Sequence, residues 1–151
     1  MRLAPSVIAV AVLALPACHH AAPSTLDGHL AMPDGRHVLV AGTTNLPEQA
    51  QLLVTLQAAA DRGIIVQALP LVKDGRFQAL LALPGGLAGG DYSVRLTFSP
   101  AAFDWSRGKV LHAVGQHGEH LTGPWAKPDG DVTILQRELP LTIPQSKGDP
   151  S

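Results

Sequence analysis

The chain has 151 residues, a formal net charge of −1 with its histidines neutral, and a hydrophobic content of 46%. This length accommodates a single domain of ordinary size. The nearly balanced charge includes no basic patch, so the sequence gives no indication of nucleic-acid binding and offers no electrostatic attachment to a membrane. The sequence therefore predicts one small globular domain.

The first seventeen residues have the three parts of an export signal. The α-amino group and Arg2 give a positive start, residues 7–15 form an apolar run, and Ala17 is a small residue suited to a cleavage site. A stable membrane-spanning helix takes about 20 apolar residues, so this run is too short to stay in a bilayer. We therefore expect residues 1–17 to be a signal peptide that is removed.

Cys18 is the only cysteine of the chain, and it directly follows Leu15-Pro16-Ala17. This stretch resembles the lipobox of bacterial lipoproteins, typically Leu-small-small-Cys, although Pro16 departs from the usual small residue. The resemblance implies that a diacylglycerol group is attached to the Cys18 thiol and that the chain is cleaved in front of it. Two or more acyl chains hold a protein stably in a membrane, so we expect a lipid-anchored protein.

Two other interpretations of Cys18 remain open at this point. A secretory signal cut near Ala17 or Ala22 would discard the cysteine or leave a free thiol, and a buried structural cysteine is the other alternative. A lone thiol in an oxidising compartment is a liability unless it is modified, which favours lipidation. His19 lacks the aspartate of an inner-membrane retention signal. We therefore expect the outer membrane of a two-membrane bacterium, with the domain facing the periplasm.

The rest of the chain divides into three parts by composition. Residues 18–33 are rich in Ala, His, Pro and Ser without sustained periodicity, and we predict that they form a flexible tether. Residues 145–151 are polar, and we predict a disordered tail there. The part between them, residues 34–144, is predicted to be the folded domain.

Turn signals such as Asp74-Gly75 and Gly89-Gly90 divide this domain into short runs rich in Val, Ile, Leu, Thr and Tyr. The clearest strand is predicted at residues 92–98, where apolar and polar side chains alternate. Similar runs predict strands at residues 36–43, 51–57, 64–72, 76–83, 109–114 and 132–143. About seven strands without a convincing amphipathic helix indicate an all-β fold, an immunoglobulin-like antiparallel β-sandwich.

Two local features of this domain are also predicted. Residues 49–61 contain three successive alanines and are compatible with a helix, but the β-prone run Leu53-Val54-Thr55 favours a strand followed by a loop. Gly90-Asp91-Tyr92 opens its strand as a tyrosine corner does, in which the phenol bonds to backbone a few residues upstream. The alternative for Tyr92 is a plain core aromatic, and both roles are structural.

Four segments of the domain carry a resemblance to a family. They are Gly42 to Pro47, Lys73 to Phe77, Gly90 to Val94, and Gly115 to Pro124 with its Gly-Glu-His-Leu-Thr-Gly-Pro ending. Occurring in this order between residues 38 and 143, they resemble small, uncharacterised bacterial exported proteins with an immunoglobulin-like domain. The resemblance implies this fold and implies no reaction.

The residues that most suggest a metal site are His112, His117 and His120. Imidazole is a favoured ligand of transition metals, and these three side chains converge if Gly115 and Gly118 bend the chain. No cysteine or acidic pair accompanies them at a diagnostic spacing, so solvent-facing loop histidines are the plainer interpretation. We expect no bound metal and no other cofactor.

No residue pattern predicts catalysis. Nucleophilic chemistry needs a serine or cysteine that is held by a base, and none of the domain's serines lies in a nucleophile-elbow sequence. No convincing carboxylate pair for glycoside hydrolysis is present, and no glycine-rich loop precedes a helix. We therefore expect that the protein is not an enzyme.

Three loop residues are candidates for contact with a partner, namely Trp105, Trp125 and Glu119. Loop tryptophans stack on sugars or anchor a protein partner, or alternatively they fold over the open ends of a core. Glu119 either binds a partner or accepts backbone hydrogen bonds in its own loop. The sequence thus predicts a non-catalytic binding or structural role in the cell envelope, with a protein or glycan partner. The alternative is a secreted domain that binds a small ligand or a metal through the three histidines.

Overall fold

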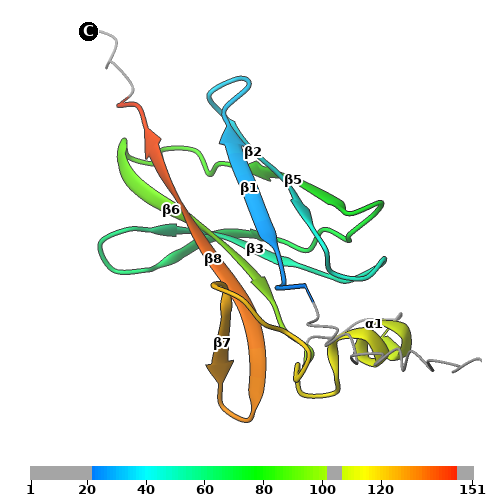
Figure 1. Ribbon diagram of the computed structural model, residues 1–151. Helices are drawn as coiled ribbons and strands as arrows, with labels where there is room; N and C mark the ends of the chain where they lie inside the picture. Colours follow the sequence, from blue (N-terminus) through cyan, green and yellow to red (C-terminus); the bar gives the residue numbers. More distant parts are fainter. Residues whose placement is uncertain (1–21, 102–106, 146–151) are drawn as a thin grey trace, which may run out of the picture.

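The computed structural model describes residues 22–101 and 107–145 (Figure 1). In chain order the elements are β1 (Leu26–Ala31), β2 (His37–Thr44), β3 (Leu53–Ala58), β4 (Ile64–Ala68), β5 (Arg76–Ala82), β6 (Gly90–Phe98), α1 (Arg107–Val114), β7 (Ala126–Asp129) and β8 (Val132–Ile143). No helix in these two ranges is long and apolar enough to cross a membrane.

The strands form two antiparallel sheets that pack together, so the protein is an all-β sandwich, as the sequence predicts (Figure 1). One sheet has the order β1-β2-β5, and the other has the order β4-β3-β6-β8-β7. The first, second and fifth strands therefore share one sheet, while the third, the sixth and the last share the other. An immunoglobulin-like sandwich distributes its strands in this way.

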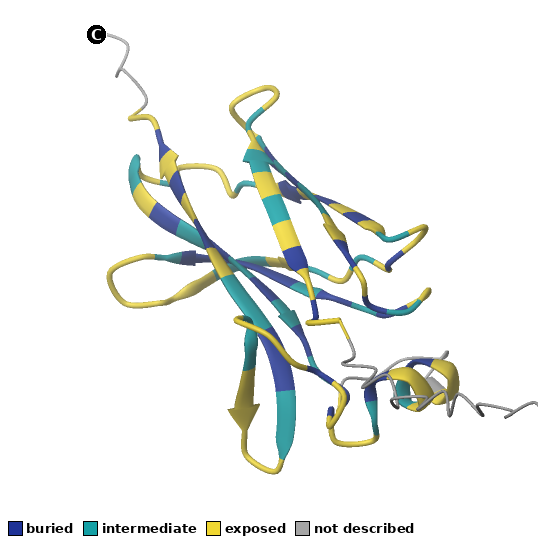
Figure 2. Cartoon of the chain, in the orientation of Figure 1, coloured by how far each residue is buried: buried dark blue, intermediate teal, exposed yellow. Residues whose placement is uncertain are grey.

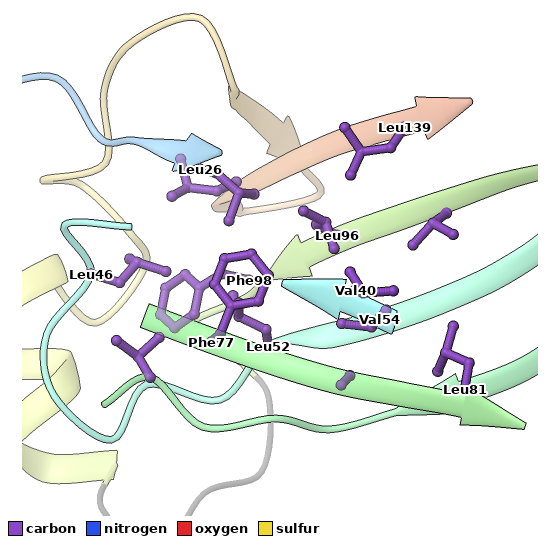
Figure 3. Packing of buried hydrophobic residues seen from close by; sticks show 14 of the residues in the cluster. Leu26, Val40, Leu46, Leu52, Val54, Phe77, Leu81, Leu96, Phe98 and Leu139 are labelled. Carbon is purple, nitrogen blue, oxygen red and sulfur yellow. The ribbon is translucent and has the colours of Figure 1, made fainter. Parts of the chain in front are cut away.

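The core lies between the two sheets, because alternate residues of each strand point to the same face. On β5 and β6 the inward residues are Phe77, Ala79, Leu81, Tyr92, Val94, Leu96 and Phe98. The alternation of buried and less buried residues along the strands is visible in Figure 2, and Figure 3 shows Phe77 and Phe98 within the buried cluster. Full burial of one such Leu or Phe side chain contributes roughly 2 kcal/mol. The inner faces therefore supply most of the driving force for this fold.

The predicted tether at residues 18–33 is too long, because its second half belongs to the sandwich. Residues 26–31 form β1, which pairs with β2 along its whole length. Leu26 is fully buried, and Leu30 packs against the core. Gly28 separates these two leucines, so the segment shows too few apolar side chains to reveal its alternation in the sequence. The folded domain therefore begins well before residue 34.

The strand predicted at residues 109–114 is wrong, because this segment lies within the helix α1. Val110 and Val114 are both buried, and a spacing of four places them on one helix face. A short apolar run fits a strand and a helix equally well, so periodicity alone does not separate the two.

Residues 49–61 contain a strand and no helix. Residues 53–58 form the strand β3, so the strand interpretation is confirmed over the helix.

The short strand β7 was not predicted, and its sequence Ala-Lys-Pro-Asp has a single apolar side chain apart from proline. It forms because it pairs with the long strand β8, an interaction that local sequence does not encode.

Tyr92 forms the predicted corner. Its phenol donates a hydrogen bond to the carbonyl oxygen of Ala88, 2.5 Å away and four residues upstream. The ring is nearly buried, with 9% of the residue exposed. The bond fixes the loop that leads into β6, the strand that pairs with both β3 and β8.

Replacement of Tyr92 by Phe keeps the buried ring and removes only this hydrogen bond. We expect the free energy of unfolding of Tyr92→Phe to fall by about 1 kcal/mol, the net contribution of one such bond. Urea denaturation of both proteins, followed by circular dichroism, measures the difference. Superimposable curves would show that the phenol bond does not stabilise the corner.

Candidate functional site

The three candidate metal ligands do not come together. His112 lies on α1, whereas His117 and His120 lie in the following loop, and all three are exposed. His117 Nδ1 lies 3.4 Å from Glu119 Oε1, and His120 Nδ1 lies 3.0 Å from the carbonyl oxygen of Ala113. Among the described residues, no group of three or more His, Cys, Asp or Glu side chains is placed to hold a metal ion.

Glu119 caps its own loop. Its Oε2 accepts a hydrogen bond from the backbone N–H of His117 at 3.1 Å, as one of the two sequence interpretations predicts. Hydrogen bonds from the backbone N–H of Glu119 itself and from that of His117 lower the pKa of this carboxyl, and the neighbouring His117 side chain adds to the effect. A Cβ on Gly115, which has a φ of 89°, would overlap Glu119 Oε2. The carboxylate therefore serves the conformation of the loop.

Trp125 lies at the edge of the core. Its half-buried side chain packs against the buried cluster, and the Arg137 guanidinium carbon lies 4.5 Å from the ring centroid. Arg137 Nη1 also donates to Asp27 Oδ1 at 2.7 Å and to the carbonyl oxygen of Leu26 at 2.9 Å. Because an arginine covers one face of the ring, Trp125 is not an open platform for a ligand. Trp105 lies outside the described residues.

The described serines have structural hydrogen bonds. Ser93 Oγ accepts from the Gln57 side-chain amide at 3.0 Å, Ser99 Oγ accepts from the Ala101 backbone at 3.2 Å, and Ser24 Oγ accepts from the Thr122 backbone at 3.1 Å. Cys18 and Ser106 lie outside the described residues. Within the described part, no serine has a histidine among its hydrogen-bond partners.

Most polar side chains on the outer face of the larger sheet are hydrogen-bonded to one another. Glu138 Oε1 accepts from Arg62 at 2.8 Å and from Arg95 at 3.1 Å. Partial burial raises the pKa of Glu138, but the hydrogen bonds and charges of Arg95 and Arg62 outweigh it and lower the pKa below its ordinary value. The Gln57 amide donates to Ser93 on the same face, although its buried Oε1 has no partner among the described atoms. This face offers few polar groups to a ligand.

A groove of about 700 Å³ lies on the outer face of the three-stranded sheet, and we call it the sheet groove. Side chains from all three strands and from the segment before β5 line it. The strand register aligns Asp27, Thr43 and Arg76 in one row across the sheet, and His29, Ala41 and Gln78 in the next row. The volume lies within the usual range of small-molecule sites.

Two cations project beside this groove because of a tight turn. Asp74 and Gly75 have φ values of 52° and 70°, the left-handed geometry of a two-residue type I′ hairpin turn. Lys73 and Arg76 exchange both backbone hydrogen bonds, at 2.8 and 3.0 Å. Residues paired in this way across antiparallel strands place their side chains on the same face. The turn therefore holds an ammonium and a guanidinium next to each other.

The cations of the sheet groove lack ion-pair partners within the described residues, whereas its one carboxylate has a partner. Neither Lys73 nor Arg76 takes part in any of the described salt bridges, but Asp27 is paired with Arg137. Asp74 lies at the tip of this turn, and Glu48, from the segment before β3, contacts it: Glu48 Oε2 accepts from the Asp74 backbone N–H at 2.8 Å. Neither residue lines the groove. The carboxylates of Glu48 and Asp74 offset the charges of Lys73 and Arg76, so the electrostatic potential around the groove is nearly neutral. An anionic ligand would therefore be recognised by direct contact with the two cations.

Two exposed apolar side chains, those of Leu71 and Leu80, lie at the groove or on the same sheet face. The large hydrophobic residues most exposed in the described structure are Ile64, Leu69, Leu71 and Leu80, at 65%, 59%, 44% and 57%. Leu71 lines the groove itself, and Leu80 lies on the same outer face of β5 as Gln78. The groove thus combines polar groups with an apolar border.

The sites predicted from the sequence do not include this groove, although the sequence contains a signal for it. Asp74-Gly75 was interpreted only as a turn. A two-residue Asp-Gly turn also places the residues on either side opposite each other, so Lys-Asp-Gly-Arg already implies two adjacent cations.

Comparisons of the chain with protein-family models, with curated proteins and with solved structures found no match.

The loop contact of Glu119 predicts a pH-dependent stability. The folded-state pKa lies below the ordinary value of 4.5, so the carboxylate stabilises the fold above that value and loses this effect as the pH falls through the folded pKa. We expect Glu119→Gln, which keeps an acceptor oxygen but no charge, to lower the thermal midpoint at neutral pH. The difference from wild type should vanish under acid conditions.

Thermal unfolding between neutral and acid pH, followed by circular dichroism, measures this difference. Asp131→Asn is the matched control, because the described structure gives the Asp131 carboxylate no hydrogen bond or ion pair. A constant difference between Glu119→Gln and wild type at all pH values would contradict the assigned role.

Proposed function

We propose that this protein is a bacterial lipoprotein whose β-sandwich has a non-catalytic binding role in the cell envelope. The anchor part of the proposal depends on the sequence, since Cys18 and the export signal before it lie outside the described residues. It is supported by the lipobox resemblance of Leu15-Pro16-Ala17-Cys18 and by the short apolar run in front of it. Because His19 replaces the aspartate of the retention signal, the proposed site is the outer membrane, facing the periplasm.

The sheet groove is the observation that carries the binding part of the proposal. The backbone N–H and C=O groups of its strands are hydrogen-bonded within the sheet, so a ligand that lies across the strands contacts side chains. These side chains are a hydroxyl, an amide, an imidazole and two cations that have no ion-pair partner in the described structure, from Thr43, Gln78, His29, Lys73 and Arg76. Hydroxyl-rich ligands that also carry carboxylates or phosphates satisfy such a set. We therefore assign the groove to an acidic glycan.

The other candidate functions have less support. The histidines that a metal-binding domain would use lie in separate contacts with Glu119 and Ala113. The described serines form structural hydrogen bonds, and none of these bonds pairs a serine with a histidine that would activate it as a nucleophile. The resemblance to small exported proteins with an immunoglobulin-like domain implies this fold and no reaction.

Replacement of Cys18 by Ser tests the anchor. Wild-type protein should incorporate radiolabelled palmitate in cells and fractionate with membranes, whereas Cys18→Ser should lose both properties because a serine hydroxyl is not alkylated with diacylglycerol. His20→Ser is the control and should behave as wild type. Mass spectrometry of the mature N-terminus gives a direct check, and an unmodified Cys18 or a start after residue 18 would overturn the anchor.

The acidic-glycan proposal is tested by titration calorimetry of the purified mature protein in neutral detergent. The probes are an oligogalacturonate and its neutral methyl ester. We expect binding of the acidic form only, and about tenfold weaker binding for Lys73→Gln and for Arg76→Gln, since each removes a charge-assisted hydrogen bond.

Arg36→Gln is the matched control, because Arg36 is exposed and lines a different hollow, beside Gly85 and Pro144. Its affinity should equal that of wild type. Equal affinities for the acid and the ester, or unchanged binding in both groove variants, would contradict the assignment.

A further inference from the structure

The start of the described chain is fastened to one end of the sandwich. We call Pro23 to Thr25 the strap. The Asn45 side chain donates to the Pro23 carbonyl oxygen at 2.9 Å and accepts from the Thr25 backbone at 2.8 Å. On the other side, the Ser24 backbone N–H donates to the Thr122 carbonyl oxygen at 3.0 Å, and the Thr122 backbone N–H donates to Ser24 Oγ at 3.1 Å. The chain is therefore held from Pro23 onward.

This attachment leaves very little free chain after Cys18. Residues 19–22 separate the cysteine from the strap. A fully extended chain spans at most about 3.6 Å per residue, so Pro23 lies within roughly 18 Å of Cys18 along the chain. The sequence-based tether of residues 18–33 would have allowed the domain to move freely, whereas this distance does not.

The two ends of the sandwich are made of different segments. At the strap end, one hollow of about 340 Å³ brings together Ala22, Asn45 and Pro47 with the end of α1 and with His120. At the other end, a second hollow joins the turn at Gly35, the segment 83–87 and the end of β8. Figure 1 shows the β1–β2 turn and the end of β8 at one end, and the start of β1 and α1 at the other. Strand β2, with 8 residues, separates the ends by roughly 25 Å.

We infer that the strap end, with α1 and the loop 115–124, lies on the membrane surface. This inference depends on the proposed lipid anchor at Cys18. The short distance between anchor and strap places this end next to the bilayer and directs the turn at Gly35 and the segment 83–87 away from it. The occupant of this surface is the headgroup layer of the membrane that holds the lipid.

The charge of α1 and the loop 115–124 is compatible with a negatively charged headgroup layer. Glu119 is the only acidic residue between positions 107 and 124, and its carboxylate is engaged in its own loop. Lys109 and the three histidines of this region are exposed. In these two segments no excess of negative charge therefore opposes contact with anionic lipids.

Energy transfer from a single label to the membrane tests the orientation. Two variants, Thr122→Cys at the strap end and Gly85→Cys at the far end, each carry one dye. Thr122 contacts the strap through backbone atoms, and a Cβ at Gly85 meets no atom within 4 Å, so both changes suit the fold. Since lipidation consumes the Cys18 thiol, the introduced cysteine is the one available for labelling. The lipidated proteins are placed in phosphatidylethanolamine and phosphatidylglycerol vesicles with acceptor dyes on the headgroups.

We expect several-fold more energy transfer from position 122 than from position 85. Insertion of a long Gly-Ser linker between His20 and Ala21 should remove most of that difference, because it releases the domain from the surface. Equal transfer from both positions in protein shown by mass spectrometry to carry lipid would overturn the orientation and leave the anchor intact. Protein without lipid would overturn both the anchor and the orientation.

Discussion

The alternation of side chains on the central strands is the constraint on which the rest of the structure depends. With a period of two, burial of Phe77, Ala79 and Leu81 on β5 leaves Arg76, Gln78 and Leu80 on the outer face. A shift of one residue in register would exchange the two sets and expose the core. The buried face therefore fixes the lining of the sheet groove.

The parts of the fold that the sequence predicts are those whose local pattern agrees with their final environment. The strand at 92–98 alternates over its full length, and the Tyr92 corner follows from the glycines before it. Strand β1 and helix α1 were missed or misassigned because their environments are set by distant partners. Leu26 is buried because pairing with β2 places β1 in the sandwich, where its inner face joins the core. Val110 and Val114 satisfy either period until tertiary packing selects the helix.

The site was less predictable than the fold because its features are contacts between distant residues. Arg137 reaches Asp27, 110 positions earlier in the chain, and thereby removes the one carboxylate that would compete with an anionic ligand in the sheet groove. The same arginine covers one face of the Trp125 ring, so this tryptophan, a candidate for stacking on a sugar, is part of the edge of the core. The Lys73 and Arg76 pair is the exception, since a local Asp-Gly turn determines it.

The sheet groove and the strap lie near each other. This proximity restricts the kinds of ligand that are compatible with the proposed function. Thr44 connects them, because its hydroxyl donates to the Thr25 carbonyl oxygen at 2.7 Å and its backbone N–H donates to the Gly75 carbonyl oxygen at 2.9 Å. The turn that carries the two cations is thus joined to the end that the proposed anchor would hold at the bilayer. With this anchor, a ligand in the groove would lie beside the membrane surface. Glycans that belong to the envelope meet this condition wherever the anchor resides, whereas a freely diffusing acidic polymer would have to approach the negatively charged headgroups first.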